Sequence, residues 1–359
     1  MSDRRTFIKR AAGFGAGIAF TSCGLLRSQT PSAVRRAVTV GGRRLKTIDV
    51  HAHCVVPEAM ALMGSRGTPA RNQILDSAQL RADRLRVMDE QGIDVEALSI
   101  NPFWYATDRD LSGKIIALQN EKLSSLCAEQ PDRFVAFASV ALQHPELAAE
   151  QLERAMKALG LRGAAIGGNV NGEEISAARF NPFWAKAEEL GALIFIHPQG
   201  LSVPELQKRL QGNGFLSNVI GNPLETTIAL SHLIFDGTLD RYPGLKICGA
   251  HGGGFLPSYP DRSDHGCLAF PTNCAGTILK KQPTEYLRQL YFDSLVFSPE
   301  ALRHLVTECG AGQIMIGTDY PFPWTTTAID HVMGTPGLSA ADQRAILGET
   351  AARLLRIPL

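Results

Sequence analysis

The stretch Thr47-Ile48-Asp49-Val50-His51-Ala52-His53 is a short apolar run that ends in two histidines. Its length and its β-branched residues predict a buried strand. Side chains on a strand alternate between its two faces, so His51 and His53 are expected to point the same way. Two neutral imidazoles placed like this can bind one divalent metal ion, although packed or exposed histidines give the same string.

Three more polar residues stand at the ends of apolar runs further along the chain. They are His197 after residues 193–196, His251 after residues 247–250, and Asp319 after residues 314–318. In a barrel of parallel strands the carboxyl ends converge on one point, where barrel enzymes build their sites. Three imidazoles and one carboxylate meeting there would suit zinc or another divalent first-row ion.

Apolar runs alternate with longer amphipathic segments from residue 47 to the C-terminus. The runs expected to be strands are residues 47–53, 95–102, 134–142, 162–170, 192–198, 246–252, 290–295 and 313–319. Helical patterns cover residues 77–91, 111–130, 145–159, 182–190, 224–239, 299–309 and 340–348. Strands that are mostly each followed by a helix favour parallel pairing through right-handed crossovers. The predicted fold class is therefore α/β, a closed (β/α)8 TIM barrel.

A doubly wound open sheet is the alternative fold. It would need a glycine-rich phosphate turn after an early strand, and the only early glycine cluster, residues 13–17, precedes the first strand. No GxSxG, Walker or SxxK string occurs in the sequence, so serine nucleophiles and nucleotide hydrolysis have no support.

The composition describes a globular chain without a nucleic-acid partner. Of its 359 residues, 45% are hydrophobic and 20% are charged, which excludes general disorder. Lys and Arg (36) nearly balance Asp and Glu (35), and no basic stripe interleaved with aromatic residues follows the first 45 residues.

The N-terminal residues resemble an export signal. Arg4 and Arg5 precede a weakly apolar run rich in Gly and Ala, as in twin-arginine signals, so residues 1–30 are expected to be a signal peptide. Residues 31–44 would be a linker and residues 45–359 the barrel. The string Thr21-Ser22-Cys23-Gly24 is similar to a degraded lipobox, which would acylate Cys23 and anchor the chain to a membrane. The expected location is therefore periplasmic.

The thiols of an exported chain can form disulfides, and the spacing of the cysteines indicates which of them could pair. Cys267 and Cys274 are close enough in one loop to form a local disulfide, and no CxxC pair suggests a zinc knuckle. Buried free thiols are expected at Cys127, Cys248 and Cys309.

Several strings, taken in order, resemble the amidohydrolase superfamily (amidohydrolase family 2). They are residues 48–53 (IDVHAH), 163–171 (GAAIGGNVN), 196–198 (IHP), 225–229 (ETTIA), 250–254 (AHGGG) and 316–323 (IGTDYPFP). The likeness runs from about residue 46 to residue 324. Within the superfamily the chain is similar to the branch of metal-dependent decarboxylases related to α-amino-β-carboxymuconate-ε-semialdehyde decarboxylase.

This resemblance implies a ligand set and a proton-transfer group. His51, His53, His197 and Asp319 would bind one divalent metal ion, usually zinc, with Mn2+ or another first-row ion possible and a water completing the sphere. His251 would act beside that water, with Asp319, as the acid/base pair.

The resemblance also implies arginines that hold a substrate carboxylate. Arg262, eleven residues after His251, would reach into the neighbouring subunit's site, so a homodimer is expected. Arg71, five residues before Asp76, is the second, though this loop aligns loosely. Two guanidinium groups suit a carboxylate held bidentately, and each arginine has an ordinary surface role as its alternative.

Two departures from the family pattern bear on the metal and the substrate. Residues 163–171 contain no lysine, so the carbamylated lysine that bridges two metals in binuclear members is missing, and one metal is favoured. Phe215 stands where the family decarboxylase has a tryptophan, and Gln199-Gly200 replaces Trp-Asp, so the pocket wall has changed.

The function expected from these features is non-oxidative decarboxylation of a small unsaturated or aromatic carboxylic acid. A metal ion lowers the pKa of its bound water and polarises a substrate oxygen, while His251 and Asp319 transfer protons. Hydrolysis of an amide, lactone or vinylogous acid on the same site is the alternative, since the same groups serve both. A non-catalytic periplasmic metal-binding barrel is the alternative of another class, and it would have no use for His251.

Overall fold

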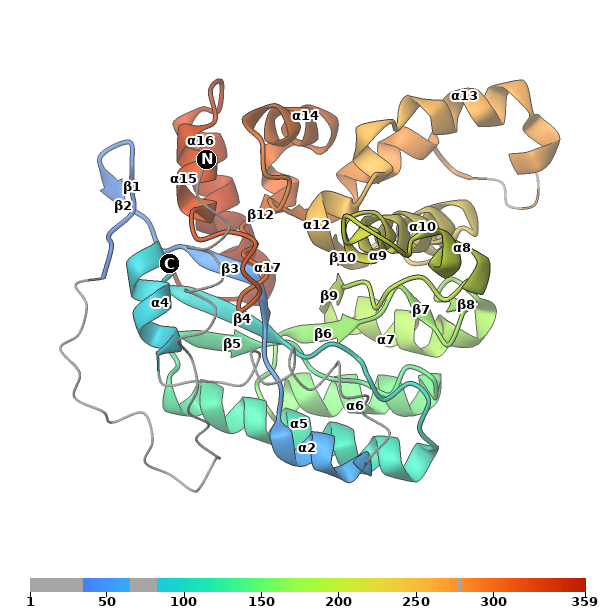
Figure 1. Ribbon diagram of the computed structural model, residues 1–359, viewed down its shortest axis with the longest axis horizontal. Helices are drawn as coiled ribbons and strands as arrows, with labels where there is room; N and C mark the ends of the chain where they lie inside the picture. The colour runs from blue at the N-terminus through green and yellow to red at the C-terminus, as the bar shows by residue number, and fades with distance from the viewer. Residues whose placement is uncertain (1–34, 65–82, 275, 277–278) are drawn as a thin grey trace.

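The computed structural model of the protein describes residues 35–64, 83–274, 276 and 279–359 (Figure 1). Eight parallel strands form a barrel: β3 (Ile48–His53), β4 (Val95–Ser99), β5 (Phe134–Ala136), β6 (Gly163–Ile166), β9 (Leu193–Ile196), β10 (Lys246–Gly249), β11 (Tyr291–Asp293) and β12 (Ile314–Met315). They pair as β3-β4-β5 and as β6-β9-β10-β11-β12. Parallel bridges from Ala138 to Ala164 and from Asp49 to Ile316 join the two sheets on both sides. The predicted (β/α)8 barrel is confirmed.

Helices follow most of the strands and pack around the barrel (Figure 1). The α-helices are α2 (Pro57–Leu62), α4 (Arg84–Gln91), α5 (Arg109–Glu129), α6 (Pro145–Lys157), α7 (Asn181–Leu190), α8 (Pro204–Arg209), α9 (Leu216–Val219), α10 (Gly221–Phe235), α11 (Thr238–Arg241), α12 (Ala250–Gly253), α13 (Asp261–Ala269), α14 (Pro299–Cys309), α15 (Ala328–Gly334), α16 (Ala340–Arg344) and α17 (Thr350–Leu355). Side-chain caps start two of the longer helices: Asp108 accepts from the N–H of Leu111 in α5, and Ser298 accepts from the N–H of Ala301 in α14.

Two short hairpins and several tight helical turns complete the described chain. The hairpins are β1 (Thr39–Val40) with β2 (Arg43–Arg44), and β7 (Asn169–Val170) with β8 (Glu173–Glu174). The turns are η2 (Ala178–Phe180), η3 (Leu256–Ser258), η4 (Pro271–Cys274), η5 (Pro283–Arg288), η6 (Ala311–Gln313) and η7 (Ala345–Glu349), the last a π-helix. The β1–β2 hairpin lies within the segment expected to be a linker. Among the described residues, no helix combines the length and apolarity needed to cross a bilayer.

The barrel interior holds its own apolar cluster. Ile48, Phe137, Phe195 and Met315 belong to it, and Leu355 of α17 packs against the same cluster. A second and larger cluster lies between the strands and the surrounding helices. Apolar side chains on both faces explain why the strands have continuous apolar sequences, as expected for a parallel sheet covered on both sides.

Several strands are shorter than their sequences predicted. The strand expected over residues 246–252 ends at Gly249, and the run 162–170 divides into β6 and the start of the β7–β8 hairpin. Beyond Gly249 the backbone N–H groups of His251 and Gly252 donate to the carboxylate of Asp293 instead of to a neighbouring strand. A side chain therefore ends this strand, and the apolar pattern alone does not reveal it.

An irregularity in β3 sets the direction of the two histidines. The register against β4 shifts between Asp49 and Ala52. Val50 belongs to the interior cluster, and the ring of His51, the next residue, lies 5.0 Å from the ring of Phe195 in that cluster. Both neighbours thus face inward, as a β-bulge allows.

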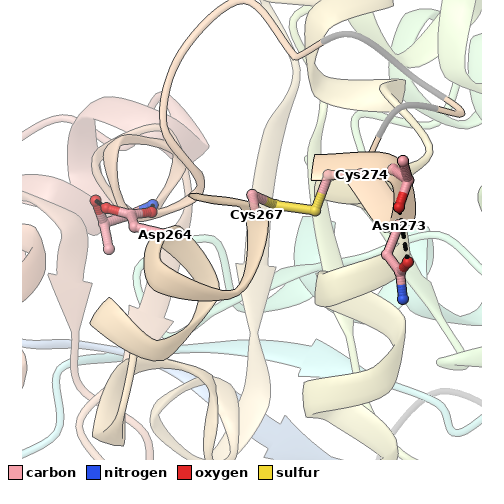
Figure 2. Close-up of a disulfide and its surroundings, with 6 residues drawn as sticks. Asp264, Cys267, Asn273 and Cys274 are labelled. Carbon is pink, nitrogen blue, oxygen red and sulfur yellow. Dashed lines mark hydrogen bonds between the residues drawn. A yellow bond between two sulfur atoms is a disulfide. The ribbon is translucent and has the colours of Figure 1, made fainter. Parts of the chain in front are cut away.

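The segment after β10 projects from the barrel as α13 and η4 (Figure 1). No residue of α13 is buried. A disulfide between Cys267 and Cys274 joins α13 to η4 (Figure 2). The carboxylate of Asp264 accepts from the N–H and hydroxyl of Thr284, which ties the segment to η5. These contacts, more than a core, hold the projection in place. Cys127, Cys248 and Cys309 are free thiols, as predicted; Cys248 and Cys309 are buried as expected, whereas Cys127 is only partly buried, because it lies near the end of α5.

Replacement of Gly348 by alanine is expected to destabilise the barrel. A Cβ at this position would lie 2.0 Å from the carbonyl oxygen of Lys46, which is backbone and has little room to move. We expect Gly348→Ala to lower the free energy of unfolding by about 2–3 kcal/mol, as overpacking does. Gly312→Ala is the matched control, since no atom lies within 4 Å of its added Cβ. Urea unfolding measures both, and equal stabilities would contradict the packing described here.

Candidate metal centre

Four predicted residues meet at the carboxyl ends of the strands. His51 and His53 end β3, His197 directly follows β9, and Asp319 lies in the loop after β12. One ligand atom from each lies within 4.8 Å of the other three. All four residues are buried, with at most 6% of their surface exposed. Residues separated by up to 268 positions in the chain thus form one compact cluster.

The arrangement of donor atoms fits a cation. The Nε2 atoms of His51 and His53 lie 3.0 Å apart, and Asp319 Oδ1 lies 3.1 Å and 2.9 Å from them. Neither ring nitrogen of His197 has a hydrogen-bond partner, although both are buried. Buried polar atoms without partners are rare in native proteins and indicate a missing ligand or water. Burial lowers the pKa of His53 and of His197, so both rings are neutral and offer lone pairs.

The electrostatics at His51 lead to the same conclusion. Burial opposes a charge on this ring, yet the carboxylates of Asp319 and Asp293 raise the pKa of His51 to about 10. Burial likewise opposes ionisation of Asp319, and the neighbouring histidines hold its pKa well below the usual range. The site therefore favours positive charge at the point where the Nε2 atoms meet. A divalent cation would take the place of the proton on His51.

Asp293 fixes the orientation of the groups around the cluster. Its Oδ2 accepts from His51 Nδ1 at 2.6 Å and from the N–H of His251 at 2.8 Å. Its Oδ1 accepts from the N–H groups of Gly252 (2.8 Å) and Leu295 (3.1 Å). With Nδ1 as the donor, His51 must carry its lone pair on Nε2, the atom that faces the cluster. Carboxylate partners of this kind orient metal-binding histidines and raise their basicity.

His53 is held by a second set of contacts. Its Nδ1 lies 3.0 Å from Ser99 Oγ, and the Ser99 hydroxyl donates to Ala52 O at 3.3 Å. Ser99 thus accepts from Nδ1–H, and the lone pair of His53 also lies on Nε2. On the other side, Arg84 Nη1 donates to the carbonyl of His53 at 2.9 Å, and the guanidinium lies 4.7 Å from the ring centroid of Tyr320, next to Asp319.

A buried polar layer supports β3 from its outer face. Arg84 Nε donates to Glu96 Oε2 at 2.5 Å, and both residues are 2% exposed. Asp49 accepts from the N–H groups of His51 (2.9 Å) and Thr318 (3.2 Å), and so joins β3 to the loop that carries Asp319. Burial and the nearby Glu96 raise the pKa of Asp49 to about 7. The metal-facing side chains therefore rest on a scaffold that is itself hydrogen-bonded.

His251 and Asp319 both have left-handed backbones. Their φ angles are 55° and 57°, a conformation uncommon for residues with side chains. Such strain concentrates at functional sites. His251 Nε2 lies 3.6 Å from Asp319 Oδ2, and 16% of the His251 side chain is exposed. Gly254 permits this turn, because a Cβ there would lie 2.1 Å from the carbonyl oxygen of Pro223. His251 is thus placed beside the cluster with one side open to solvent.

The residues that the sequence predicted to bind the substrate are not part of this cluster. Arg262 is exposed in the first turn of α13. Phe215 is 60% exposed and precedes α9 with a φ of 56°. Arg71 and its partner Asp76 lie outside the described residues. The structure therefore brings together the four cluster residues and His251, while Arg262 and Phe215 lie on the surface of this chain.

Sequence reasoning did not identify Asp293, Ser99 or Arg84. Asp293 ends β11, so the rule that selected His197, a polar residue closing an apolar strand, would have found it. Ser99 ends β4 in the same way. Arg84 gave no such signal, because it lies on α4 and reaches the outer face of the barrel.

The chain matches a known protein family and resembles curated decarboxylases. The amidohydrolase family model matches residues 48–357. A 2-amino-3-carboxymuconate-6-semialdehyde decarboxylase of Dictyostelium discoideum is 35% identical over 242 residues, which cover 67% of this chain and 66% of that protein, just under two thirds. A gamma-resorcylate decarboxylase of Polaromonas sp. is 30% identical over 300 residues, which cover 80% of this chain and 90% of that protein.

Two solved structures with the same fold are decarboxylases. The 5-carboxyvanillate decarboxylase of Sphingomonas paucimobilis superposes with a TM-score of 0.80 at 26% identity, covering 88% of this chain and 100% of that one. A dihydroxybenzoic acid decarboxylase of Polaromonas sp., with bound manganese and the inhibitor 2-nitroresorcinol, gives a TM-score of 0.77 at 28% identity, covering 87% of this chain and 97% of that one.

Replacing Asp293 with asparagine is expected to weaken metal binding. The amide cannot accept from His51 and from three backbone N–H groups as the carboxylate does, so His51 loses the tautomer with a free Nε2. We expect the dissociation constant for zinc in Asp293→Asn to rise about 10-fold to 100-fold, the usual effect of removing such a partner. Competition with a chelating dye measures it. Asp264→Asn, which changes a carboxylate on the projecting segment, is the control, and equal affinity in both variants would contradict the role of Asp293.

Proposed function

The chain belongs to the amidohydrolase family, and from this we propose that it is a metal-dependent enzyme that decarboxylates a small aromatic or unsaturated carboxylic acid without an oxidant. The observation that carries the proposal is the buried cluster of three histidines and Asp319, with His251 beside it. The curated relatives and solved structures with this fold, named above as decarboxylases, support the reaction type.

The four residues that would hold the ion are His51, His53, His197 and Asp319. A divalent ion there would act as a Lewis acid that binds a substrate oxygen and stabilises the negative charge developing in the reaction. Asp293 and Ser99 keep the lone pairs of His51 and His53 directed at it. All four residues are buried, so these interactions act in a low dielectric.

The chemical step requires one proton at the carbon that bears the carboxylate. When that carbon is protonated, the carbon–carbon bond to the carboxylate breaks, its electron pair returns to the ring or double bond, and CO2 leaves. His251 is the group placed to donate this proton, because its Nε2 lies beside the cluster, 3.6 Å from Asp319 Oδ2, and its side chain is partly exposed. A proton from solvent then restores it, so the reaction consumes one proton and needs no redox partner.

The ion we propose is Zn2+, with Mn2+ as the other candidate. Three imidazoles and one carboxylate form a ligand set that suits zinc. A dihydroxybenzoic acid decarboxylase with a similar fold contains manganese, which supports the second candidate.

We propose that Arg262 acts on a substrate held by a second copy of the chain in a homodimer. Arg262 lies on the projecting segment, where Tyr259, Leu268 and Phe270 are 69%, 71% and 65% exposed. An exposed apolar group next to an exposed arginine is suited to a subunit contact that also delivers a charge. Phe215 would line the pocket wall, and Arg71 would supply the second cation for the carboxylate.

We propose that the protein works in the periplasm after twin-arginine export. Arg4 and Arg5 in the N-terminal sequence support this, and the disulfide between Cys267 and Cys274 suits an oxidising compartment. Lipidation at Cys23 would add an anchor. Fractionation of cells, with and without Arg4 and Arg5 replaced by lysine, tests this location.

The reaction is tested with purified protein reconstituted with Zn2+ or Mn2+. Incubation with hydroxybenzoates and with a 2-amino-3-carboxymuconate semialdehyde, followed by measurement of CO2, should detect turnover that disappears after chelation and returns with the ion. Hydrolysis of amides or lactones by the same sample, without CO2 release from any acid, would contradict decarboxylation.

Replacing His251 with asparagine is expected to reduce turnover without removing the ion. Asparagine tolerates the left-handed backbone at this position, so the fold should survive. We expect the turnover number to fall by about 10² to 10⁴, the range for loss of an acid/base group, with metal content near one equivalent. His304→Asn, a surface change on α14, is the control. Full activity in His251→Asn would remove this residue from the mechanism.

Mixing two inactive variants tests the role of Arg262. Arg262→Ala and His251→Asn should each be nearly inactive alone. In a mixed dimer, the chain with an intact His251 receives Arg262 from its partner, so one site of two is complete. Random pairing should restore about a quarter of the wild-type activity in a co-expressed sample. No recovery in a mixture shown to contain heterodimers would mean that Arg262 acts within its own chain or not at all.

A further inference from the structure

The β7–β8 hairpin contacts α10 through polar side chains (Figure 1). Asn169 and Glu174 are register partners across the hairpin, so their side chains lie on the same side of it. The Asn169 amide donates to Glu225 Oε1 of α10. Ser176, just after the hairpin, donates to Oδ2 of Asp236, which ends the same helix, at 2.5 Å. Hydrogen bonds, and not apolar packing alone, thus join the segment after β6 to this helix.

Glu225 is a buried carboxyl group without a cation. It is 4% exposed, and the hydrogen bond that it accepts comes from a neutral amide. Oε2 of Glu174 is also a buried atom, and it has no hydrogen-bond partner. Among the residues that the structure describes, neither carboxyl pairs with a lysine or an arginine. Burial, opposed by the Asn169 amide and reinforced by the charge of Glu174, raises the pKa of Glu225 to about 7.

The other charged groups near this contact lie toward the far end of α10. His232 and Asp236 act on Glu174 in opposite directions, and His232 Nδ1 lies 2.9 Å from Asp236 Oδ2. Arg241 donates to the carbonyl oxygen of Asp236 at 3.4 Å. Asp236 is eleven residues, or about three helical turns, beyond Glu225. These groups therefore do not offset the charge that Glu225 acquires when it loses its proton.

Glu225 lies against the backbone that follows β6. A Cβ built on Gly168, two residues after this strand, would lie 3.0 Å from Glu225 Oε1. The carbonyl of Ile166, the last residue of the strand, accepts from the N–H of His197 at 3.0 Å. The carboxyl group thus contacts a loop that begins beside one of the four histidine and aspartate residues of the cluster.

The same end of α10 holds the turn that presents His251. Thr227 Oγ1 accepts from the N–H of Phe255 at 2.7 Å. A Cβ built on Gly254 would lie 2.1 Å from the carbonyl oxygen of Pro223. The first turns of α10 therefore contact both the loop after β6 and the loop after β10, and Glu225 lies between these contacts in the sequence.

We propose that Glu225 is a positioning residue that works in its protonated form: without a charge it lets the β7–β8 hairpin pack on α10, and loss of the proton separates the two. A buried charge without a partner is costly, so release of the proton is coupled to exposure of the carboxyl to water. The step moves one proton from Glu225 to solvent and needs no other reactant. Its consequence for turnover, looser loops beside His197 and His251, rests on the proposed function, whereas the proton-dependent packing does not.

The direction of the pH dependence follows from the two pKa values of Glu225. An exposed glutamate has a pKa of about 4.3, and in the packed hairpin the pKa of Glu225 is about 7. Between these values the packed state binds more protons than the open state, so packing weakens as the pH rises from about 4.3 to about 7 and is constant above. Opening of the hairpin should become about 10-fold to 100-fold more frequent between about pH 5 and about pH 8.

Hydrogen exchange over residues 163–176 of the zinc-loaded full chain measures this opening. Exchange in wild type is divided by exchange in Glu225→Gln at the same pH, which removes the intrinsic effect of pH. Because glutamine cannot ionise, this ratio should rise about 10-fold to 100-fold between about pH 5 and about pH 8. Glu173→Gln is the matched control, since Glu173 is an exposed carboxylate of the same hairpin, paired with Arg179, and this variant should follow wild type.

Two further measurements keep the test independent of one variant. In Glu174→Gln the neighbouring charge is absent, so the pKa of Glu225 falls and the rise in exchange should shrink by about twofold or more. At about pH 6, between the two pKa values, the infrared spectrum should show the carbonyl band of a protonated carboxyl group that disappears in Glu225→Gln and remains in Glu173→Gln.

Exchange with the same pH dependence in wild type, Glu225→Gln and Glu174→Gln, or a carboxyl band unaffected by Glu225→Gln, would overturn the inference whatever the activity. Turnover supplies the last readout: the turnover number of Glu225→Gln relative to wild type should rise as the pH passes about 7. A constant ratio would remove the positioning role. Both spectroscopic signals in a protein that releases no CO2 would contradict the proposed function alone.

Discussion

The hydrogen bond between Asp293 and His51 is the interaction on which the rest of the site depends. One carboxylate accepts from the imidazole that faces the cluster and from the backbone N–H groups of His251 and Gly252. It therefore sets the tautomer of a metal-facing histidine and, at the same time, ends β10 in the turn that presents His251. A change in this one carboxylate would alter both the orientation of His51 and the position of His251.

Burial makes the cluster selective for a cation. His53 and His197 are neutral because burial lowers their pKa, and the carboxylate of Asp319 stays ionised because of the surrounding rings. Without a positive charge, lone pairs and a carboxylate would face one another in a low dielectric, which is unfavourable. The strained backbones of His251 and Asp319 and the buried pair of Arg84 with Glu96 are held in place by a rigid barrel. The scaffold thus maintains an arrangement that would not persist in an isolated loop.

The barrel and the four cluster residues were predictable from sequence because both follow from local patterns. Continuous apolar runs mark strands covered on both faces, and polar residues at their carboxyl ends must meet in a closed barrel. The strand ends and the residues that support the cluster could not be predicted, because they depend on neighbours distant in the chain. The end of β10 at Gly249 is set by Asp293, 44 residues later, and Arg84 supports His53 from a helix outside the barrel. The contact between Asn169 and Glu225 likewise forms only when the β7–β8 hairpin meets α10. Periodicity contains no information about such contacts.

X-ray absorption at the metal edge, on protein carrying one equivalent of zinc, tests the central claim most directly. The account predicts nitrogen and oxygen neighbours at about 2.0–2.2 Å, with the outer-shell scattering of three imidazoles. That signal should fall to two imidazoles when His197 is replaced by alanine. A spectrum with one imidazole or none, or with sulfur at about 2.3 Å, would show that the ion binds elsewhere and would contradict the account.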